Sequence, residues 1–198
     1  FTLATKTFQL SSQFTVQGKD LRPFSISRRT PNTTLSAEGE ILQYEKPILK
    51  LNGRWEGPVE ELAGFRGKEA DPFLKELKGS LRMQFSLEGP KERPEEMAVS
   101  GDFSSPLLAY KSLQFKNVSS QYAYRQNTLS LSRLSGILWG GHLLSDATVR
   151  LSGEVPYTLK MELKQAKLSD VIQHFAPDQK KLKGLLFVTV QAEGELKQ

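Results

Sequence analysis

The chain has no cysteine among its 198 residues. This absence excludes disulfide bonds, thiolate metal sites and thiol nucleophiles from the sequence. Histidine is nearly as scarce, and the only two, His142 and His174, do not have the spacing of a helical metal-binding pair. We predict a surface or helix-lining role for both histidines rather than a metal-binding or catalytic one.

Motifs of the common enzyme classes are also missing. The sequence has no G-x-S-x-G elbow, no P-loop and no G-x-G-x-x-G segment. The adjacent carboxylates Glu60–Glu61 and Glu95–Glu96 diverge on any helix or strand, so they do not form a general acid–base pair. Gly140–Gly141 indicates a bulge or a sharp bend rather than a phosphate site. We therefore predict no enzymatic activity, no catalytic residue, no metal site and no cofactor.

Long apolar runs are absent as well. None approaches the length of about 18 residues that a membrane-spanning helix needs, and the sequence shows no signal-peptide pattern. We expect residues 1–198 to be one continuous β-rich segment of a longer protein, with any anchor or targeting segment outside it. The net charge of +5 is mildly basic. The basic groups Arg28–Arg29 and Lys180–Lys181 are short and lack a nucleic-acid-binding motif, so we predict no nucleic-acid partner.

What the sequence does contain is alternation of apolar and polar residues, which predicts strands with one apolar and one polar face. The clearest run extends from Val155 to Leu163, and another extends from Thr34 to Leu42. Turn signals such as Gly18–Asp20 divide the strands at short intervals. These patterns predict a meander of antiparallel strands in which one side faces water.

One phrase occurs twice, at Leu77–Gly89 and Leu182–Gly194. Each copy begins Leu-Lys-Gly, continues as an alternating strand and ends in Glu-Gly. Each also follows a short helical pattern, at Asp71–Leu77 and at Ser169–Phe175. The repeated unit of helix, turn and strand therefore occupies residues 71–89 and 168–194. Repeats of this kind are typical of extended structures that bind rather than catalyse.

Helical signals are otherwise few, with a third short helix expected at Pro58–Gly64. Three short helices cannot cover so many strands. We predict an all-β fold with a few short helices, in which a curved antiparallel meander forms an open groove. The alternative is a β-sandwich, in which a second sheet covers the apolar face and makes a dry core.

A large uncovered apolar face on a folded protein usually marks a ligand or partner site. In the open-groove interpretation these residues line a groove for a hydrophobic ligand, and in the sandwich they form closed core. The candidate lining residues are Leu81, Met83, Phe85, Leu87, Val149, Leu151, Tyr157, Leu159, Met161, Leu186, Val188 and Val190.

The second half of the chain carries a series of motifs in a fixed order. They are Val99–Phe103, Leu113–Val118, Gln121–Tyr124, Thr128–Leu134, Trp139–Gly141, Tyr157–Met161, Leu168–Ile172 and Leu182–Gly184. This order, over about residues 79–194, resembles the AsmA-like family of Gram-negative envelope proteins, including its TamB-type relatives. In that family, a strand that ends in an aromatic residue and Gly-Gly precedes an outgoing strand, and a short helix and a Gly-x-Leu strand close the unit.

The resemblance implies a long curved β-groove with an apolar inside. It also implies a periplasmic location, in a protein anchored in the inner membrane. Its expected partner is phospholipid, and its expected role is lipid transport to the outer membrane or assembly of that membrane. The alternative that we retain is a scaffold or assembly module, which binds another envelope protein through exposed sheet edges.

Overall fold

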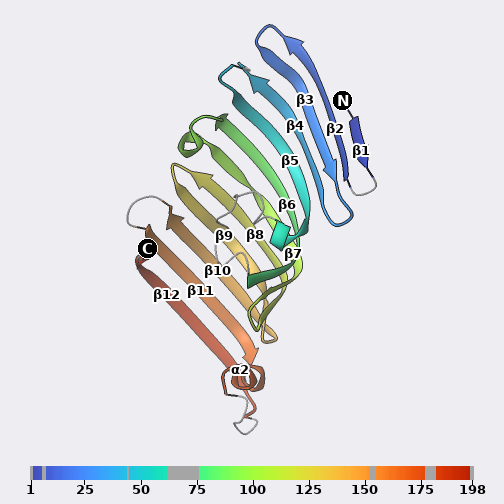
Figure 1. Ribbon diagram of the computed structural model, residues 1–198. Helices are drawn as coiled ribbons and strands as arrows, with labels where there is room; N and C mark the ends of the chain where they lie inside the picture. Colours follow the sequence, from blue (N-terminus) through green and yellow to red (C-terminus); the bar gives the residue numbers. More distant parts are fainter. Residues whose placement is uncertain are drawn as a thin grey trace.

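The computed structural model describes residues 2–5, 8–43, 45–61, 76–151, 155–176 and 182–196. Twelve strands form one antiparallel sheet in which each strand pairs with its neighbours in sequence (Figure 1). The strands are β1 (Thr2–Thr5), β2 (Phe8–Gln17), β3 (Asp20–Arg29), β4 (Thr34–Leu42), β5 (Ile48–Pro58), β6 (Leu77–Pro90), β7 (Ala98–Tyr110), β8 (Leu113–Arg125), β9 (Thr128–Leu138), β10 (Gly141–Arg150), β11 (Val155–Lys167) and β12 (Leu185–Leu196).

The predicted all-β fold, an open and curved antiparallel meander, is confirmed. The sheet is a single layer whose two ends, β1 and β12, do not meet (Figure 1). The β-sandwich alternative is wrong, because all the described strands belong to one sheet rather than to two packed sheets. The meander is continuous through the charged loop after β6, since β6 pairs directly with β7.

The predicted helices differ in outcome. The helix expected at Ser169–Phe175 is confirmed as α2 (Leu168–Phe175), which begins one residue earlier. Pro58 is the last residue of β5 and residues 59–61 have 3-10 geometry, so the expectation that a helix starts at Pro58 is wrong, while residues 62–64 of that expected helix lie outside the described residues. Most of the helix expected at Asp71–Leu77 lies outside the described residues, and Leu77 already belongs to β6. A further 3-10 turn, η2 (Pro94–Glu96), joins β6 to β7.

Tight hairpins account for the short connections between strands. Gln126 and Asn127 link β8 to β9 with φ values of 49° and 58°. Trp139 and Gly140 link β9 to β10 with φ values of 50° and 75°. Positive φ at both central residues is the property of a type I′ turn, whose twist matches that of the flanking strands. The sharp bend expected at Gly140–Gly141 is therefore a hairpin turn.

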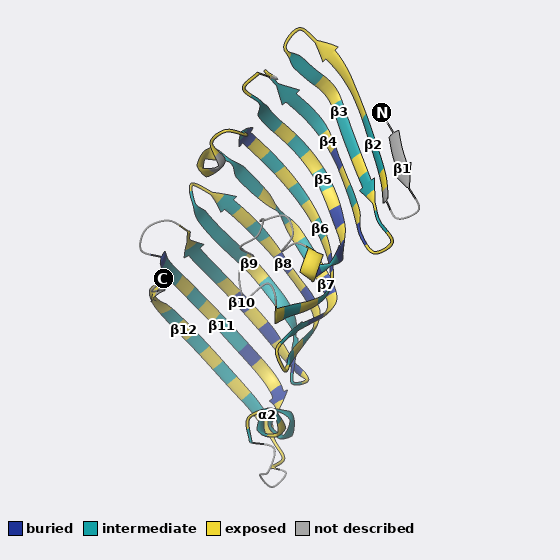
Figure 2. Ribbon diagram, viewed as in Figure 1, coloured by how far each residue is buried: buried dark blue, intermediate teal, exposed yellow. Residues whose placement is uncertain are grey.

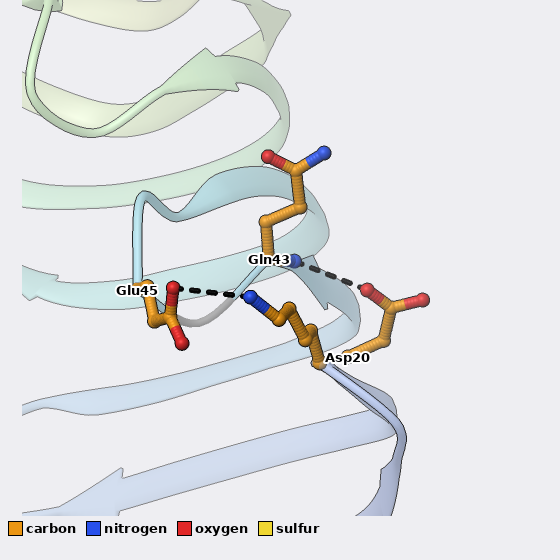
Figure 3. Close-up of polar contacts among 4 residues, drawn as sticks. Asp20, Gln43 and Glu45 are labelled. Atoms are coloured by element: carbon orange, nitrogen blue, oxygen red, sulfur yellow. Dashed lines mark hydrogen bonds and ion pairs between the residues drawn. The ribbon is translucent and has the colours of Figure 1, made fainter.

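Polar contacts fasten neighbouring hairpins to one another at the strand ends opposite α2. The backbone N–H of Gln43 donates to Asp20 Oδ1 at 3.1 Å, and Lys19 Nζ lies 3.2 Å from Glu45 Oε2 (Figure 3). The Lys19–Glu45 ion pair is well exposed, so it contributes little to stability. The backbone contact positions the β2–β3 turn against the end of β4.

Three of the bulges in the described strands have a non-glycine residue at positive φ. Asn117 in β8, Arg133 in β9 and Gln165 in β11 have φ values of 50°, 54° and 61°. The pairing register shifts at each of these sites. A bulge adds one residue, bends its strand and increases the local twist. The apolar residues before and after each bulge therefore stay on the same face of the curved sheet.

The most deeply buried residues gather at the strand ends near α2. One cluster consists of Leu138, Leu143, Leu163 and Ala166, and Val171 of α2 packs against it. Ala166 has no exposed surface at all. A second cluster, formed by Trp55, Val59 and Leu81, lies at the same end of β5 and β6. Away from these clusters, exposed and partly buried residues alternate along strands such as β6 and β8 (Figure 2).

We predict that Gln165→Val destabilises the protein whereas Gln165→Gly does not. The left-handed conformation costs an L-residue about 1–2 kcal/mol, and a β-branched side chain tolerates it least. Valine should therefore lower the free energy of unfolding by about 1 kcal/mol, measured by urea denaturation. Glycine adopts positive φ freely and should leave the free energy of unfolding close to that of the parent. Equal midpoints for the two variants would contradict this assignment of the bulge.

Candidate functional site

The apolar side chains of successive strands lie on one face of the sheet, which we call the apolar face. Residues that pair directly in neighbouring antiparallel strands project to the same side. One such row, the central rung, crosses the sheet from β4 to β12. The central rung consists of Ala37, Gly53, Phe85, Gly101, Tyr122, Leu131, Ala147, Leu159 and Ala192.

A second row on the same face lies two residues further from α2. This outer rung consists of Gly39, Leu51, Leu87, Val99, Tyr124, Leu129, Val149, Tyr157 and Gly194. Neither rung contains a charged side chain, so nine neighbouring strands present an uncharged strip. Neighbouring strands lie about 4.8 Å apart, so a strip that crosses nine strands is at least as long as an extended hydrocarbon chain.

The two rungs are neither closed core nor free surface. Apart from buried Ala37 and exposed Gly194, every residue of both rungs is partly exposed. This distinguishes the rungs from the α2 end of the same face, where Leu163 is only 3% exposed. The apolar face thus has a packed end, which stabilises the sheet, and a strip in which apolar side chains remain accessible.

Glycines on this face make room for aromatic rings on neighbouring strands. A Cβ on Gly53 would lie 2.3 Å from the ring of Phe85 on β6. A Cβ on Gly194 would lie 3.2 Å from the ring of Tyr157 on β11. The rings therefore lie across the glycine backbone and flatten the surface of the strip.

Tyr122 spans a glycine in the same way and ends in a hydrogen bond. Its hydroxyl reaches across β7 at Gly101 and donates to the backbone carbonyl of Gln84 on β6 at 3.2 Å. Burial, with a smaller contribution from the Asp102 carboxylate, raises the pKa of Tyr122 to about 12. The phenol consequently stays neutral and keeps its proton for this bond.

The structure places the predicted lining residues on the apolar face but divides them into groups. Phe85, Leu87, Val149, Tyr157 and Leu159 lie in the two rungs. The other seven predicted lining residues lie outside both rungs. Leu81 is buried. Four residues pack against the buried clusters, namely Met83, Met161, Leu186 and Val188. Val190 pairs with Met161, and exposed Leu151 follows the end of β10.

The prediction missed the middle of the strip. Leu51, Val99, Tyr122, Tyr124 and Leu131 belong to the rungs but were not among the candidate lining residues. Their alternation is visible in the sequence. Their face relative to β6 and β11 is not, because it depends on strand register and on the bulges in β8 and β9.

A hollow of about 790 Å³ lies on the opposite, polar face, over β2–β7. Its lining includes Ser36, Glu38, Asn52, Arg54 and Ser86. Hydroxyl, amide and charged groups of this kind do not suit an acyl chain. The rung residues Ala37, Gly53, Phe85 and Gly101 also contribute to its lining, so the hollow lies behind one end of the central rung.

The described residues contain no cluster of three or more histidine, aspartate or glutamate side chains with metal-ligand geometry. His142 is exposed, and His174 lies in α2 with its ring 5.7 Å from that of Trp139. Within the same part of the chain, no helix combines the length and apolar composition that a membrane span requires.

We predict that Gly101→Ala disrupts the strip, whereas Gly136→Ala is tolerated. A Cβ at position 101 would lie 1.9 Å from the carbonyl oxygen of Gln84 and 3.0 Å from the Tyr122 hydroxyl. The sheet must shift to accept it, which should lower the free energy of unfolding by about 1–3 kcal/mol. A Cβ at Gly136 meets nothing closer than 3.4 Å. Thermal denaturation of both variants tests this, and equal losses would contradict it.

Comparisons with known proteins add no relative to this picture. No family model, no curated protein and no solved structure matches the chain. The resemblance to the AsmA-like family therefore stays a prediction from the sequence motifs. The site itself is an accessible, uncharged strip on one face of an open sheet.

Proposed function

We propose that this chain shields the acyl chains of phospholipids on its apolar face while the headgroups stay in water. The observation that carries this proposal is the partial exposure of the two uncharged rungs across nine neighbouring strands. A hydrocarbon chain laid along the rungs, across the strands, contacts aliphatic and aromatic groups throughout. An extended, uncharged surface without polar anchors suits a long hydrocarbon chain.

The expected affinity is reversible. Burial of one methylene group contributes about 0.8 kcal/mol, so a few ordered acyl carbons hold a lipid without trapping it. The rungs supply no charged group that would bind the headgroup tightly. These properties support a carrier that receives and releases lipid rather than a permanent lipid-binding site.

The biological setting follows from the AsmA-like resemblance and forms part of the same proposal. The chain acts as a periplasmic segment of an inner-membrane-anchored protein in a Gram-negative envelope. It supports lipid transport to the outer membrane or the assembly of that membrane. This proposal assigns no catalytic step, cofactor or metal to the segment.

A second candidate function is that of a scaffold for another envelope protein. The observation in its favour is that β1 and β12, among the described strands, each pair on one side only. An edge strand presents unpaired backbone N–H and C=O groups, to which a strand of another chain adds by β-augmentation. Under this alternative, the partly exposed rungs contribute to the sheet alone and carry no lipid.

We predict that Leu51→Asp combined with Leu159→Asp reduces phospholipid binding several-fold. Both leucines lie in the rungs, on strands far apart in the sheet, and each carboxylate would interrupt the uncharged strip. The measurement is mass spectrometry of phospholipid that co-purifies with the chain from a bacterial periplasm. Leu144→Asp serves as the matched control, because Leu144 is 47% exposed on the polar face of β10.

The folding of each variant is checked by circular dichroism. If the double variant unfolds while Leu144→Asp does not, the rungs are closed core and the proposal fails. The proposal also fails if the parent chain carries no phospholipid. A partner protein captured at a sheet edge, in the absence of lipid, would instead favour the scaffold.

A further inference from the structure

Large apolar side chains are exposed at the end of the sheet that carries α2, away from the rungs. Phe175 of α2 is 69% exposed, and Phe187 of β12 is 63% exposed. Leu182 and Leu185, which precede and begin β12, are also exposed. We call this region the α2 tip; Figure 1 shows α2 at one extremity of the molecule. A concentration of exposed apolar groups in one place usually marks an interaction surface.

The α2 tip is built from three chain segments that are bonded to one another. The backbone N–H of Lys167 donates to the Trp139 carbonyl at 2.9 Å, which joins β11 to the β9–β10 turn. The N–H of Leu168 donates to the Gly184 carbonyl at 3.1 Å, which joins α2 to the start of β12. The Trp139 ring also lies edge-on to Phe175, with 5.7 Å between centroids. The exposed Phe175 ring is thus held in place by the fold.

A hollow of about 580 Å³ lies beside these apolar groups, on the polar face of the sheet. Lys116 and Lys167 line it, together with Trp139, His174 and a single carboxylate, Asp170. Lys167 pairs directly with Leu185 across β11 and β12, so the basic lining and the exposed apolar residues are neighbours. Lys183, also exposed, adds a third lysine at the same end.

We infer that the α2 tip docks onto the surface of a bilayer that contains anionic phospholipid. Phe175, Leu185 and Phe187 enter the boundary between headgroups and acyl chains, as the apolar side of an interfacial helix does. Lys116 and Lys167 face the phosphate groups, and the hollow between them admits one headgroup. The lysines at the tip outnumber its single lining carboxylate, which complements a negative membrane surface.

The lysines of the tip, in combination with its aromatic residues, favour a bilayer over a protein partner. Tryptophan is enriched where one end of a side chain is apolar and the other is wet, as in the interfacial region of membranes. Protein interfaces, in contrast, are depleted of lysine at their core. Docking of the tip does not depend on whether the rungs carry lipid, because the residues involved lie outside both rungs.

The test is co-sedimentation of the chain with vesicles. The parent should bind vesicles of phosphatidylglycerol in phosphatidylcholine and bind pure phosphatidylcholine vesicles weakly. Phe175→Ser with Phe187→Ser, and separately Lys167→Glu with Lys183→Glu, should each lower the partition coefficient by roughly tenfold or more. Binding should also weaken as salt is raised, because ionic strength screens attraction to the charged surface.

Matched controls come from the other end of the molecule. Phe14→Ser with Val16→Ser removes side chains of 52% and 59% exposure on β2 and should leave vesicle binding unchanged. Lys46→Glu with Lys91→Glu reverses exposed charges in the turns opposite α2 and should weaken binding by less than twofold. Circular dichroism confirms that all four variants are folded.

Three results would overturn the inference. The parent could bind both vesicle types equally, or the Phe14 control could lose as much binding as the tip variant. The third result is a parent chain that self-associates and does not bind vesicles, and whose Phe175→Ser, Phe187→Ser variant is monomeric. That result would assign the tip to contact with a second copy of the chain. Phospholipid loading, measured on the same tip variants, should remain at the parent level. Rung variants that lose bound phospholipid but keep vesicle binding would separate the acyl-shielding proposal from the docking of the tip.

Discussion

The hydrogen-bond register between neighbouring strands is the constraint on which the rest of this structure depends. In a single-layer sheet, a register slip of one residue would move every apolar side chain of a strand to the polar face. The register from Ala37 on β4 to Ala192 on β12 keeps the central rung on one side through eight successive pairings. The bulges at Asn117, Arg133 and Gln165 preserve it where the strands bend.

Stability and accessibility are divided between the two ends of each strand. Near α2, buried groups such as Leu163 and Ala166 supply the close packing that an open sheet otherwise lacks. In the rungs, the sheet is held by backbone pairing and by rings that lie across glycines, as Phe85 does at Gly53. The apolar groups there remain partly exposed, and it is this division that leaves one face available for a ligand.

The two proposed surfaces differ in their physical chemistry. The rungs are broad and uncharged, so they suit the hydrocarbon part of a lipid. The α2 tip combines exposed phenylalanines with Lys116 and Lys167, so it suits the boundary between the acyl chains and the charged headgroups of a bilayer. Together the two proposals assign membrane docking to one end of the segment and acyl-chain shielding to the rungs along its length.

The sequence by itself determined the strands, most of the turns and α2, because alternation, turn residues and helix boundaries are local signals. β4 runs from Thr34 to Leu42, as the alternation predicts. The alternation in the sequence also placed Phe85 and Leu159 on the apolar faces of their strands. Only the tertiary structure decided that these faces align across one sheet, that Leu81 is buried while Phe85 is partly exposed, and that Leu51 and Tyr122 belong to the same strip. The physical reason is that register and burial arise from contacts between strands, and a single strand's pattern carries no information about its neighbours.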